Sequence, residues 1–301
     1  MNKILQISVL FCLSTLTISA KPLAITGSEN HRAYEIGAVA PFHTLHVNGQ
    51  TEVDVLQSSA EEYTVSLYGP ENLIDLVQID SQDGTLSIQY KKPVIILGDH
   101  HLRILVTTPK LSKLHVQEKG EVNITGIFQT EELNIVATGK TEIDIEHLQA
   151  ASVRVEAKEE AEVDVAHVDC QSLHVETDQH ASFEVQRITC PVVMLLADNR
   201  SDISLSALSA QSVTAQSNHT AEIELKGKTL SAALTARDRS SIEAGSLQAE
   251  KADVMAANGS FIDVRVSDTL NAQTETRAKV QYRGWPKEIN RSGKGLVRKN
   301  S

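Results

Sequence analysis

The chain has 301 residues, a formal net charge of −11, and only 4% aromatic residues with a single tryptophan. An acidic chain repels the phosphates of nucleic acid, and few aromatic side chains are available to stack on bases. The composition therefore predicts no nucleic-acid partner.

Residues 1–20 have the pattern of a secretory signal peptide. Lys3 precedes an apolar and hydroxyl-rich run, and the small residue Ala20 follows at a position suited to signal peptidase cleavage. The apolar run is shorter than the ~20 residues needed to cross a bilayer, and no later segment is apolar enough. We expect an exported protein without a transmembrane segment in the mature chain, located in the periplasm, at the outer surface or outside the cell.

A lead over residues 21–39 precedes a predicted sheet-like section over residues 40–112. Several apolar runs of strand length, such as YTVSLYG, GTLSIQY and LRILVTT, are separated by Gly, Pro and Asp-Gly turn signals. We expect this section to continue into the following repeats and to cap their N-terminal end.

A repeat of about 20 residues fills most of residues 113–284. In each unit the first, third, eleventh and thirteenth positions are apolar, which predicts two short strands whose inner faces line a core. Polar turn residues separate the two strands. A further apolar position after the second strand indicates a third face, which lapses at Lys228 and Ser267. The units begin at Leu133, Val153, Leu173, Val193, Val213, Ala232 and Ala252.

A fixed period of this length is typical of a solenoid, in which each coil buries its apolar face against its neighbours. We therefore expect an all-β, right-handed parallel β-helix. A helical interpretation of residues 149–162 fails because the valines there follow a two-residue rather than a 3.6-residue period. Residues 285–301 are basic and glycine-rich without an apolar period, which predicts a flexible tail.

The order of several motifs resembles one known family. These motifs are FHTLHVNGQTEVDVLQ, YTVSLYGPENLIDLVQIDSQDGTLSI, LRILVTTPKLSKLHVQEKGEVNITG, LNIVATGKTEIDIE and a closing YRGWP. They resemble the putative auto-transporter adhesin head, GIN-type domain family, over about residues 38–286. The family's glycine-rich unit is kept at Gly139 but replaced near Glu159, Gln179 and Arg200. The resemblance implies an exported β-helical protein. The family is named after adhesins, but the name does not define an activity.

Acidic residues recur at the tenth and twelfth positions of the coils, on the outer face of the second strand. Parallel coils stack at ~4.8 Å, so these carboxylates are expected to form like-charged columns. A solvated face that resists aggregation is one interpretation. The other is a calcium site or a surface for a basic partner, since carboxylate oxygens are suitable calcium ligands. The candidates are Glu142, Asp144, Glu162, Asp164, Glu184, Asp202, Glu222, Glu224, Glu243 and Asp263.

Cys170 and Cys190 occupy the same position in consecutive coils. One strand spacing is compatible with a disulfide, and an exported protein meets an oxidising compartment. The sequence predicts that the two cysteines can bridge adjacent coils. The alternative is a pair of stacked thiols at an unsuitable angle.

Other candidate sites have simpler interpretations. Asp99-His100-His101 has the residue types of a zinc site, but no complementary ligands accompany it, so a solvated loop is favoured. His147, His167 and Arg187 share one column, which favours an exposed face over a metal site. Catalytic motifs such as G-x-S-x-G and H-E-x-x-H are absent from the sequence, and no cofactor other than calcium is expected.

The combined features predict a non-enzymatic exported solenoid that presents an extended acidic face, either as an adhesin-like protein or as an envelope scaffold. Its protein or glycan partner is unknown. The alternative is a carbohydrate-active enzyme of the pectate-lyase-like β-helix type. Such an enzyme needs a local cluster of acid and base groups, whereas the acids here are spread along the whole face.

Overall fold

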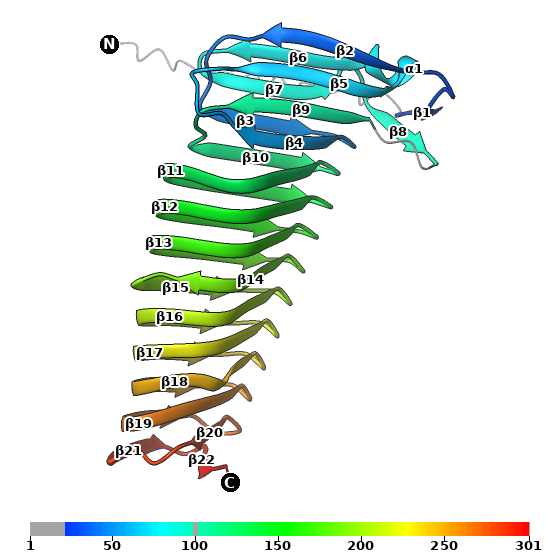
Figure 1. The fold of residues 1–301 in the computed structure, drawn as a ribbon. Helices are drawn as coiled ribbons and strands as arrows, with labels where there is room; N and C mark the ends of the chain where they lie inside the picture. The colour runs from blue at the N-terminus through cyan, green and yellow to red at the C-terminus, as the bar shows by residue number, and fades with distance from the viewer. Residues whose placement is uncertain (1–21, 99–101, 301) are drawn as a thin grey trace, which may run out of the picture.

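The computed structural model describes residues 22–98 and 102–300, which form a β-solenoid of about nine turns with about 20 residues in each coil (Figure 1). The predicted all-β solenoid is therefore confirmed. In the described residues, no helix is long and apolar enough to cross a membrane. The expected signal peptide and the Asp99-His100-His101 loop lie outside the described residues.

Most coils consist of one long strand that bends at the corners, and consecutive coils pair in parallel. Because consecutive coils share one length, equivalent positions stack, as where Ile143 pairs with Val163 and Ile145 with Val165. The strands are β10 (Lys113–Glu118), β11 (Glu121–Gly139), β12 (Glu142–Lys158), β13 (Glu162–Asp178), β14 (Ser182–Thr189), β15 (Val192–Ala197), β16 (Asp202–Ser217), β17 (Glu222–Ala236), β18 (Ser241–Ala256) and β19 (Phe261–Thr274).

Each coil has three sides that point apolar side chains into one continuous core. In the coil of β13, Val163 and Val165 come from the first side, Val168 from the second, and Leu173 and Val175 from the third, and all five are buried. The predicted two-residue alternation and the third apolar face both appear in the structure. Burial of such stacked side chains is the main stabilising contribution in a solenoid, because one coil alone cannot bury its apolar face.

The third face changes where the coil length changes. Gly227, not Lys228, pairs with Leu208 and Leu247, so a residue without a side chain stands at this place in β17. In β19, Val266 rather than Ser267 is buried, and it pairs with Ala249 after a shift in register. The apolar column of Leu208 and Leu247 is therefore interrupted in these coils.

The polar corners share a left-handed backbone. Gly139 has φ of 86°, and at the following corners Glu159, Gln179 and Arg200 have φ of 67°, 57° and 66°. The corners therefore keep a left-handed residue although glycine is replaced. A buried serine supports several of them, as where Ser240 Oγ accepts from the Arg237 N–H at 3.0 Å and donates to the Ser217 carbonyl at 2.7 Å.

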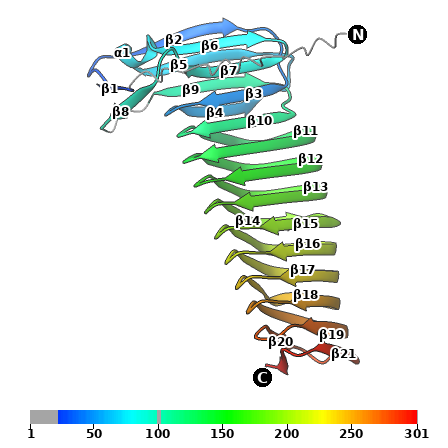
Figure 2. The same ribbon diagram turned by 180° about the vertical axis from the view of Figure 1, so that it is seen from behind.

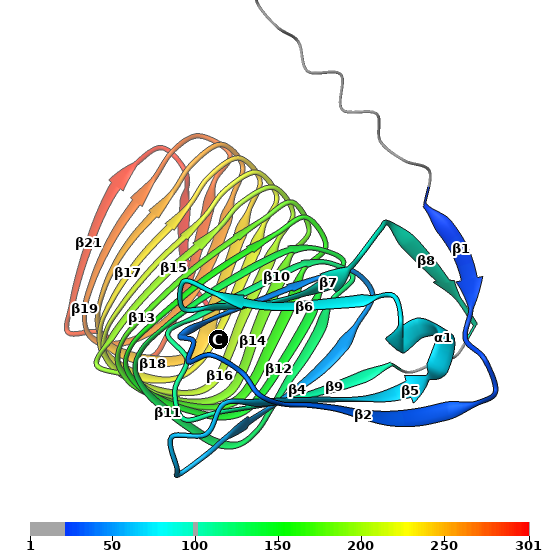
Figure 3. The ribbon, with the colours of Figure 1, turned by 90° about the horizontal axis from the view of Figure 1, so that it is seen from above.

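The N-terminal part is a twisted sheet that covers one end of the solenoid, seen from above in Figure 3. β3 and β4 form a coil in register with β10 and β11, and β7 and β9 pair with them on the other side, while β2, β5 and β6 add antiparallel strands. The elements are β1 (Leu23–Thr26), β2 (His31–Ala38), β3 (Thr44–Asn48), β4 (Glu52–Gln57), β5 (Thr64–Pro70), α1 (Glu71–Ile74), β6 (Val77–Gln82), β7 (Thr85–Tyr90), β8 (Val94–Leu97) and β9 (Arg103–Thr108).

The C-terminal segment differs from its prediction as a flexible tail. After β20 (Lys279–Arg283), β21 (Glu288–Gly293) and β22 (Leu296–Lys299) add a further coil, which closes the stack at the end opposite the N-terminal sheet (Figure 2). β21 pairs with β19, and β22 pairs with β20. The sequence period is lost here because Val264 pairs with Tyr282, which follows it by less than one full repeat.

Candidate functional site

Two columns of carboxylates follow the outer face of one side of the solenoid. Glu142 pairs with Glu162, and Asp144 with Asp164. The same register continues through Glu184 and towards Asp263, so the predicted residues do stand on one face. We call this set the acidic ladder: Glu142, Asp144, Glu162, Asp164, Glu184, Asp202, Glu222, Glu224, Glu243 and Asp263.

The ladder extends further towards the N-terminus than the sequence repeat indicated. Glu121 pairs with Glu142 on one side and with Glu52 on the other, and Asp54 pairs with Asn123, next to Asp144. The signal that could have found these residues is the shorter copy of the repeat around β4 and β10–β11. Glu52, Asp54 and Glu121 stand there in register with the tenth and twelfth positions of the full repeat.

Among the described residues, cations contact the ladder near its two ends and at Glu224, where the Lys226 ammonium lies 2.7 Å away. Arg103 contacts Glu52 at 2.5 Å and Asp54 at 3.4 Å, and Arg283 contacts Asp263 at 2.8 Å. Among the described residues, no Lys, Arg or His nitrogen lies within 4.0 Å of the carboxylates from residue 142 to residue 184 of the ladder. A groove of about 420 Å³ runs along this uncompensated stretch, with Arg103 at one end and Glu184 at the other.

The electrostatics of the middle of the ladder disfavour full ionisation. Burial and the neighbouring carboxylates raise the pKa of Asp164 to about 6. Burial, then the nearby acids, also raise the pKa values of Glu142 and Glu222. A nearby cation would stabilise the ionised form of these carboxylates, so this stretch is suited to a positively charged ligand.

Asp164→Asn should stabilise the protein at neutral pH. Because the pKa of Asp164 is higher in the folded chain, the folded state binds its proton more tightly, and stability falls as pH rises from about 4 to about 6. The isosteric amide removes this penalty. After allowing for solvent screening of a half-exposed group, the gain in unfolding free energy at pH 7 should be about 1 kcal/mol.

Urea unfolding of both proteins at pH 4 and pH 7 measures this effect. The gain should vanish at pH 4, where Asp164 is protonated in the folded chain. Glu131→Gln, at an exposed acid outside the ladder, is the matched control and should leave stability nearly unchanged at both pH values. An equal gain at both pH values for Asp164→Asn would contradict the electrostatic explanation.

Calcium binding by the ladder stays a prediction. Within residues 22–98 and 102–300, no three His, Cys, Asp or Glu side chains come together closely enough to hold a metal ion. Calcium bound between the columns should raise the melting temperature more than sodium chloride of equal ionic strength does. Replacing Glu142, Asp144, Glu162 and Asp164 by serine should abolish that difference. An identical response to both salts would leave only general screening.

The histidine column is a polar surface feature. His147 pairs with His167 in the next coil, and His167 pairs with Arg187. His147 Nε2 lies 3.0 Å from Asp169 Oδ2, and the two histidine rings are tilted with centroids 5.5 Å apart. Both imidazoles are partly exposed. The arrangement supports the interpretation as an exposed face.

The two cysteines meet inside the solenoid. Cys170 and Cys190 are buried in adjacent coils, and their Sγ atoms lie 2.7 Å apart as free thiols. The neighbouring Cys190 and burial both raise the pKa of the Cys170 thiol, which disfavours the thiolate. The structure thus brings together the pair that the sequence singled out.

We expect the pair to be oxidised, because the thiols are adjacent and the predicted export would bring the chain into an oxidising compartment. Thiol titration of the unfolded, unreduced mature protein should therefore find no free cysteine. Cys170→Ser provides the control, since it should expose one free thiol per chain. Two free thiols in the wild-type protein would refute the bridge.

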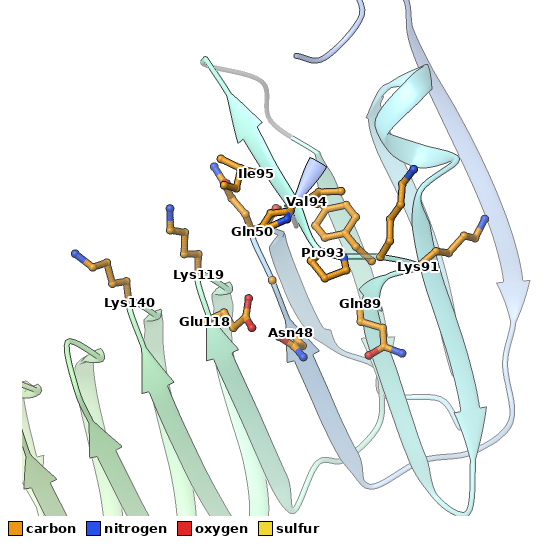
Figure 4. Close-up of a pocket in the computed structure, with 14 residues that line it drawn as sticks. Asn48, Gln50, Gln89, Lys91, Pro93, Val94, Ile95, Glu118, Lys119 and Lys140 are labelled. Atoms are coloured by element: carbon orange, nitrogen blue, oxygen red, sulfur yellow. Dashed lines mark hydrogen bonds between the residues drawn. The ribbon is translucent and has the colours of Figure 1, made fainter. Parts of the chain in front are cut away.

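A second cavity, of about 710 Å³, lies where the N-terminal sheet meets the first coils (Figure 4). Lys119 and Lys140 rise side by side from successive corners, while Lys91 lies across the cavity beyond Pro93 and Val94. Lys140 contacts Glu160 at 2.7 Å, and Lys91 donates to a backbone carbonyl. The cations therefore do not converge on one point. The sequence analysis missed this cavity, although clustered lysines in an acidic chain are a detectable signal.

Comparison with known proteins places these features in one family. No curated protein matches the chain. Crystal structures named as a putative adhesin from Parabacteroides distasonis ATCC 8503 and a putative adhesin from Parabacteroides merdae ATCC 43184 are similar to it. Their sequence identities are 18% and 15%, and their TM-scores 0.52 and 0.50. Each match covers 92% of this chain, with 100% of the first structure and 99% of the second. At such identities they show the fold alone.

The family model described as "Putative auto-transporter adhesin, head GIN domain" matches residues 41–193 and residues 163–286. The two matches together span the N-terminal coil of β3 and β4, the acidic ladder and all but the last coil. The earlier resemblance, which rested on the order of short motifs, is confirmed. The chain belongs to the auto-transporter adhesin head, GIN domain family.

Proposed function

We propose that the chain is an exported, non-enzymatic solenoid that presents the acidic ladder to a positively charged partner, as an adhesin-like protein or an envelope scaffold. The observation that carries this proposal is the uncompensated stretch from Glu142 to Glu184. Its carboxylates stack in register without a neighbouring cation in the described residues, and the pKa of Asp164 rises to about 6. A cationic surface would relieve this repulsion along several coils at once.

The rigidity of the fold supports the same proposal. Each ladder position is held by backbone pairing on both sides, so the spacing of the carboxylates is fixed before a partner arrives. Preorganisation reduces the entropy lost on binding. The family's adhesin name is consistent with a surface of this kind and with an exported location.

A binding experiment with defined probes tests the proposal. The mature chain should bind an oligolysine peptide and a deacetylated amino-sugar oligomer, with affinity that falls steeply with salt. Replacing Glu142, Asp144, Glu162 and Asp164 by their amides should reduce this affinity at least tenfold. The control carries the same charge change at exposed acids off the ladder: Glu131, Glu132, Glu159 and Glu250 to glutamine. Equal losses in both variants would show that net charge alone is responsible and would overturn the proposal.

The alternative function is that of a carbohydrate-active enzyme. The observation in its favour is the groove of about 420 Å³, which is lined by Arg103 as well as by Asp144 and Asp164. Against it, Arg103 is engaged by Glu52 and Asp54. Incubation with acidic and neutral polysaccharides, followed by measurement of released reducing ends, separates the two functions. Release that disappears in Asp164→Asn would favour the enzyme.

A further inference from the structure

The two ends of the solenoid differ in how they are covered. The N-terminal end is covered by the sheet of β2, β5 and β6, whereas the last coil ends the stack at the other end (Figure 1). In the part of the chain that the structure describes, β21 pairs only with β19 and β22 only with β20. Leu296 is 51% exposed there, and Ile289 and Val297 are only partly buried. The last coil thus leaves apolar side chains at an uncovered end.

The charge of this end is opposite to that of the molecule. Residues 277–300 hold one acid, Glu288, against eight cations, whereas the whole chain has 39 acidic and 28 basic residues. Two of the eight cations pair with carboxylates: Arg283 contacts Asp263 at 2.8 Å and Lys287 contacts Asp268 at 2.9 Å. Within the described residues, the other six have no carboxylate partner. They are Arg277, Lys279, Arg291, Lys294, Arg298 and Lys299.

The single tryptophan lies at the same end. Trp285, in the loop between β20 and β21, is 85% exposed, and the Lys299 ammonium lies 2.8 Å from the centre of its ring. A groove of about 700 Å³ beside it includes Leu230, which is 53% exposed, and Arg265. An exposed indole costs free energy in water, and its ring is suited to the boundary between water and lipid.

We propose that the C-terminal end docks onto an anionic lipid bilayer surface. The unpaired cations would face lipid headgroups, each Lys or Arg contributing roughly fivefold to partitioning, and Trp285 and Leu296 would enter the interface. A second copy's acidic ladder offers charge complementarity but no apolar surface for these two side chains. A lipid interface satisfies both features, and the uncompensated stretch of the ladder, from residue 142 to residue 184, lies several coils away from this end.

Vesicle binding tests this proposal, with the fluorescence of the single tryptophan, Trp285, as the probe. The protein used is residues 21–301, which retains every residue that the structure describes. Phosphatidylcholine vesicles containing phosphatidylglycerol should sediment the protein and shift the Trp285 emission to shorter wavelength, and added salt should reverse both effects. Vesicles of phosphatidylcholine alone should do neither. Absence of binding to the anionic vesicles would overturn the proposal.

Charge variants locate the binding surface. Lys294→Glu, Arg298→Glu and Lys299→Glu combined should lower partitioning at least a hundredfold, and Trp285→Ala should lower it at least threefold in sedimentation. The matched control, Lys110→Glu, Lys113→Glu and Lys158→Glu, alters three exposed lysines on the flank and should retain most of the binding. Equal losses in both triple variants would overturn the proposal.

Two other outcomes would also reject a lipid surface. The first is that soluble polyphosphate gives the same emission shift as the vesicles and the vesicles do not sediment the protein. The end would then bind a polyanion only. The second is that the wild type does not bind vesicles and the C-terminal triple variant self-associates. The cations would then serve only to protect the edge strands from pairing with another chain. The acidic-ladder variants should bind vesicles normally, so this proposal can fail independently of the proposed function.

Discussion

Val185→Asp should lower the free energy of unfolding by about 3–5 kcal/mol, because it buries a charge that no partner neutralises. Val185 is 1% exposed on β14, between Val165 of the coil before and Leu205 of the coil after. The carboxylate would also replace an apolar side chain in the core that all coils share. Urea denaturation, followed by circular dichroism, measures the loss.

The neighbouring residue provides the control for this substitution. Glu184 lies next to Val185 in the same strand but faces outward, beside Asp164. Glu184→Ala should change stability by less than about 0.5 kcal/mol, since the substitution removes only a solvated side chain and a like charge. Equal losses for the two variants would contradict the assignment of inward and outward faces.

The coil repeat could be predicted because each coil buries apolar side chains at the same positions against its neighbours. Val153, Val155, Val163 and Val165 alternate with polar residues, and parallel stacking brings equivalent residues together without any further information. For the same reason the acids of the ladder and the pair of cysteines were found by counting whole repeats along the chain. In a periodic stack, residues that are one repeat apart in the sequence lie side by side in adjacent coils.

The prediction failed where coil length changes. The sequence predicted that the third face lapses at Lys228 and Ser267, but not the register there. Gly227 pairs with Leu208 and Leu247, and the buried Val266 pairs with Ala249, because the coil length changes between these strands. The C-terminal strands were missed because their offset from the preceding coil is shorter than the repeat. Contacts between different parts of the chain, such as Arg103 with Glu52, follow from tertiary pairing that no local pattern contains.

Gly227 lies at the register shift between β16 and β17, where the two coils approach closely. Gly227 has φ of 139°, and a Cβ atom built on it would lie 2.1 Å from the Leu208 carbonyl oxygen and 2.5 Å from the Leu208 nitrogen. Both contacts are with backbone atoms that are fixed by the pairing of β16 (Asp202–Ser217) with β17 (Glu222–Ala236). The chain can accept a side chain here only by separating two coils.

Gly227→Ala should therefore lower the free energy of unfolding by about 2–4 kcal/mol, through the collision and the backbone strain together. Gly126→Ala is the matched control, because Gly126 has φ of 74° but its Cβ would meet no atom within 4 Å. That control carries only the cost of the left-handed backbone, about 1 kcal/mol. Urea unfolding of both variants gives the comparison. A loss in Gly227→Ala no larger than that in Gly126→Ala would show that the coils can separate there, and the close approach of Gly227 to Leu208 would not be needed for stability.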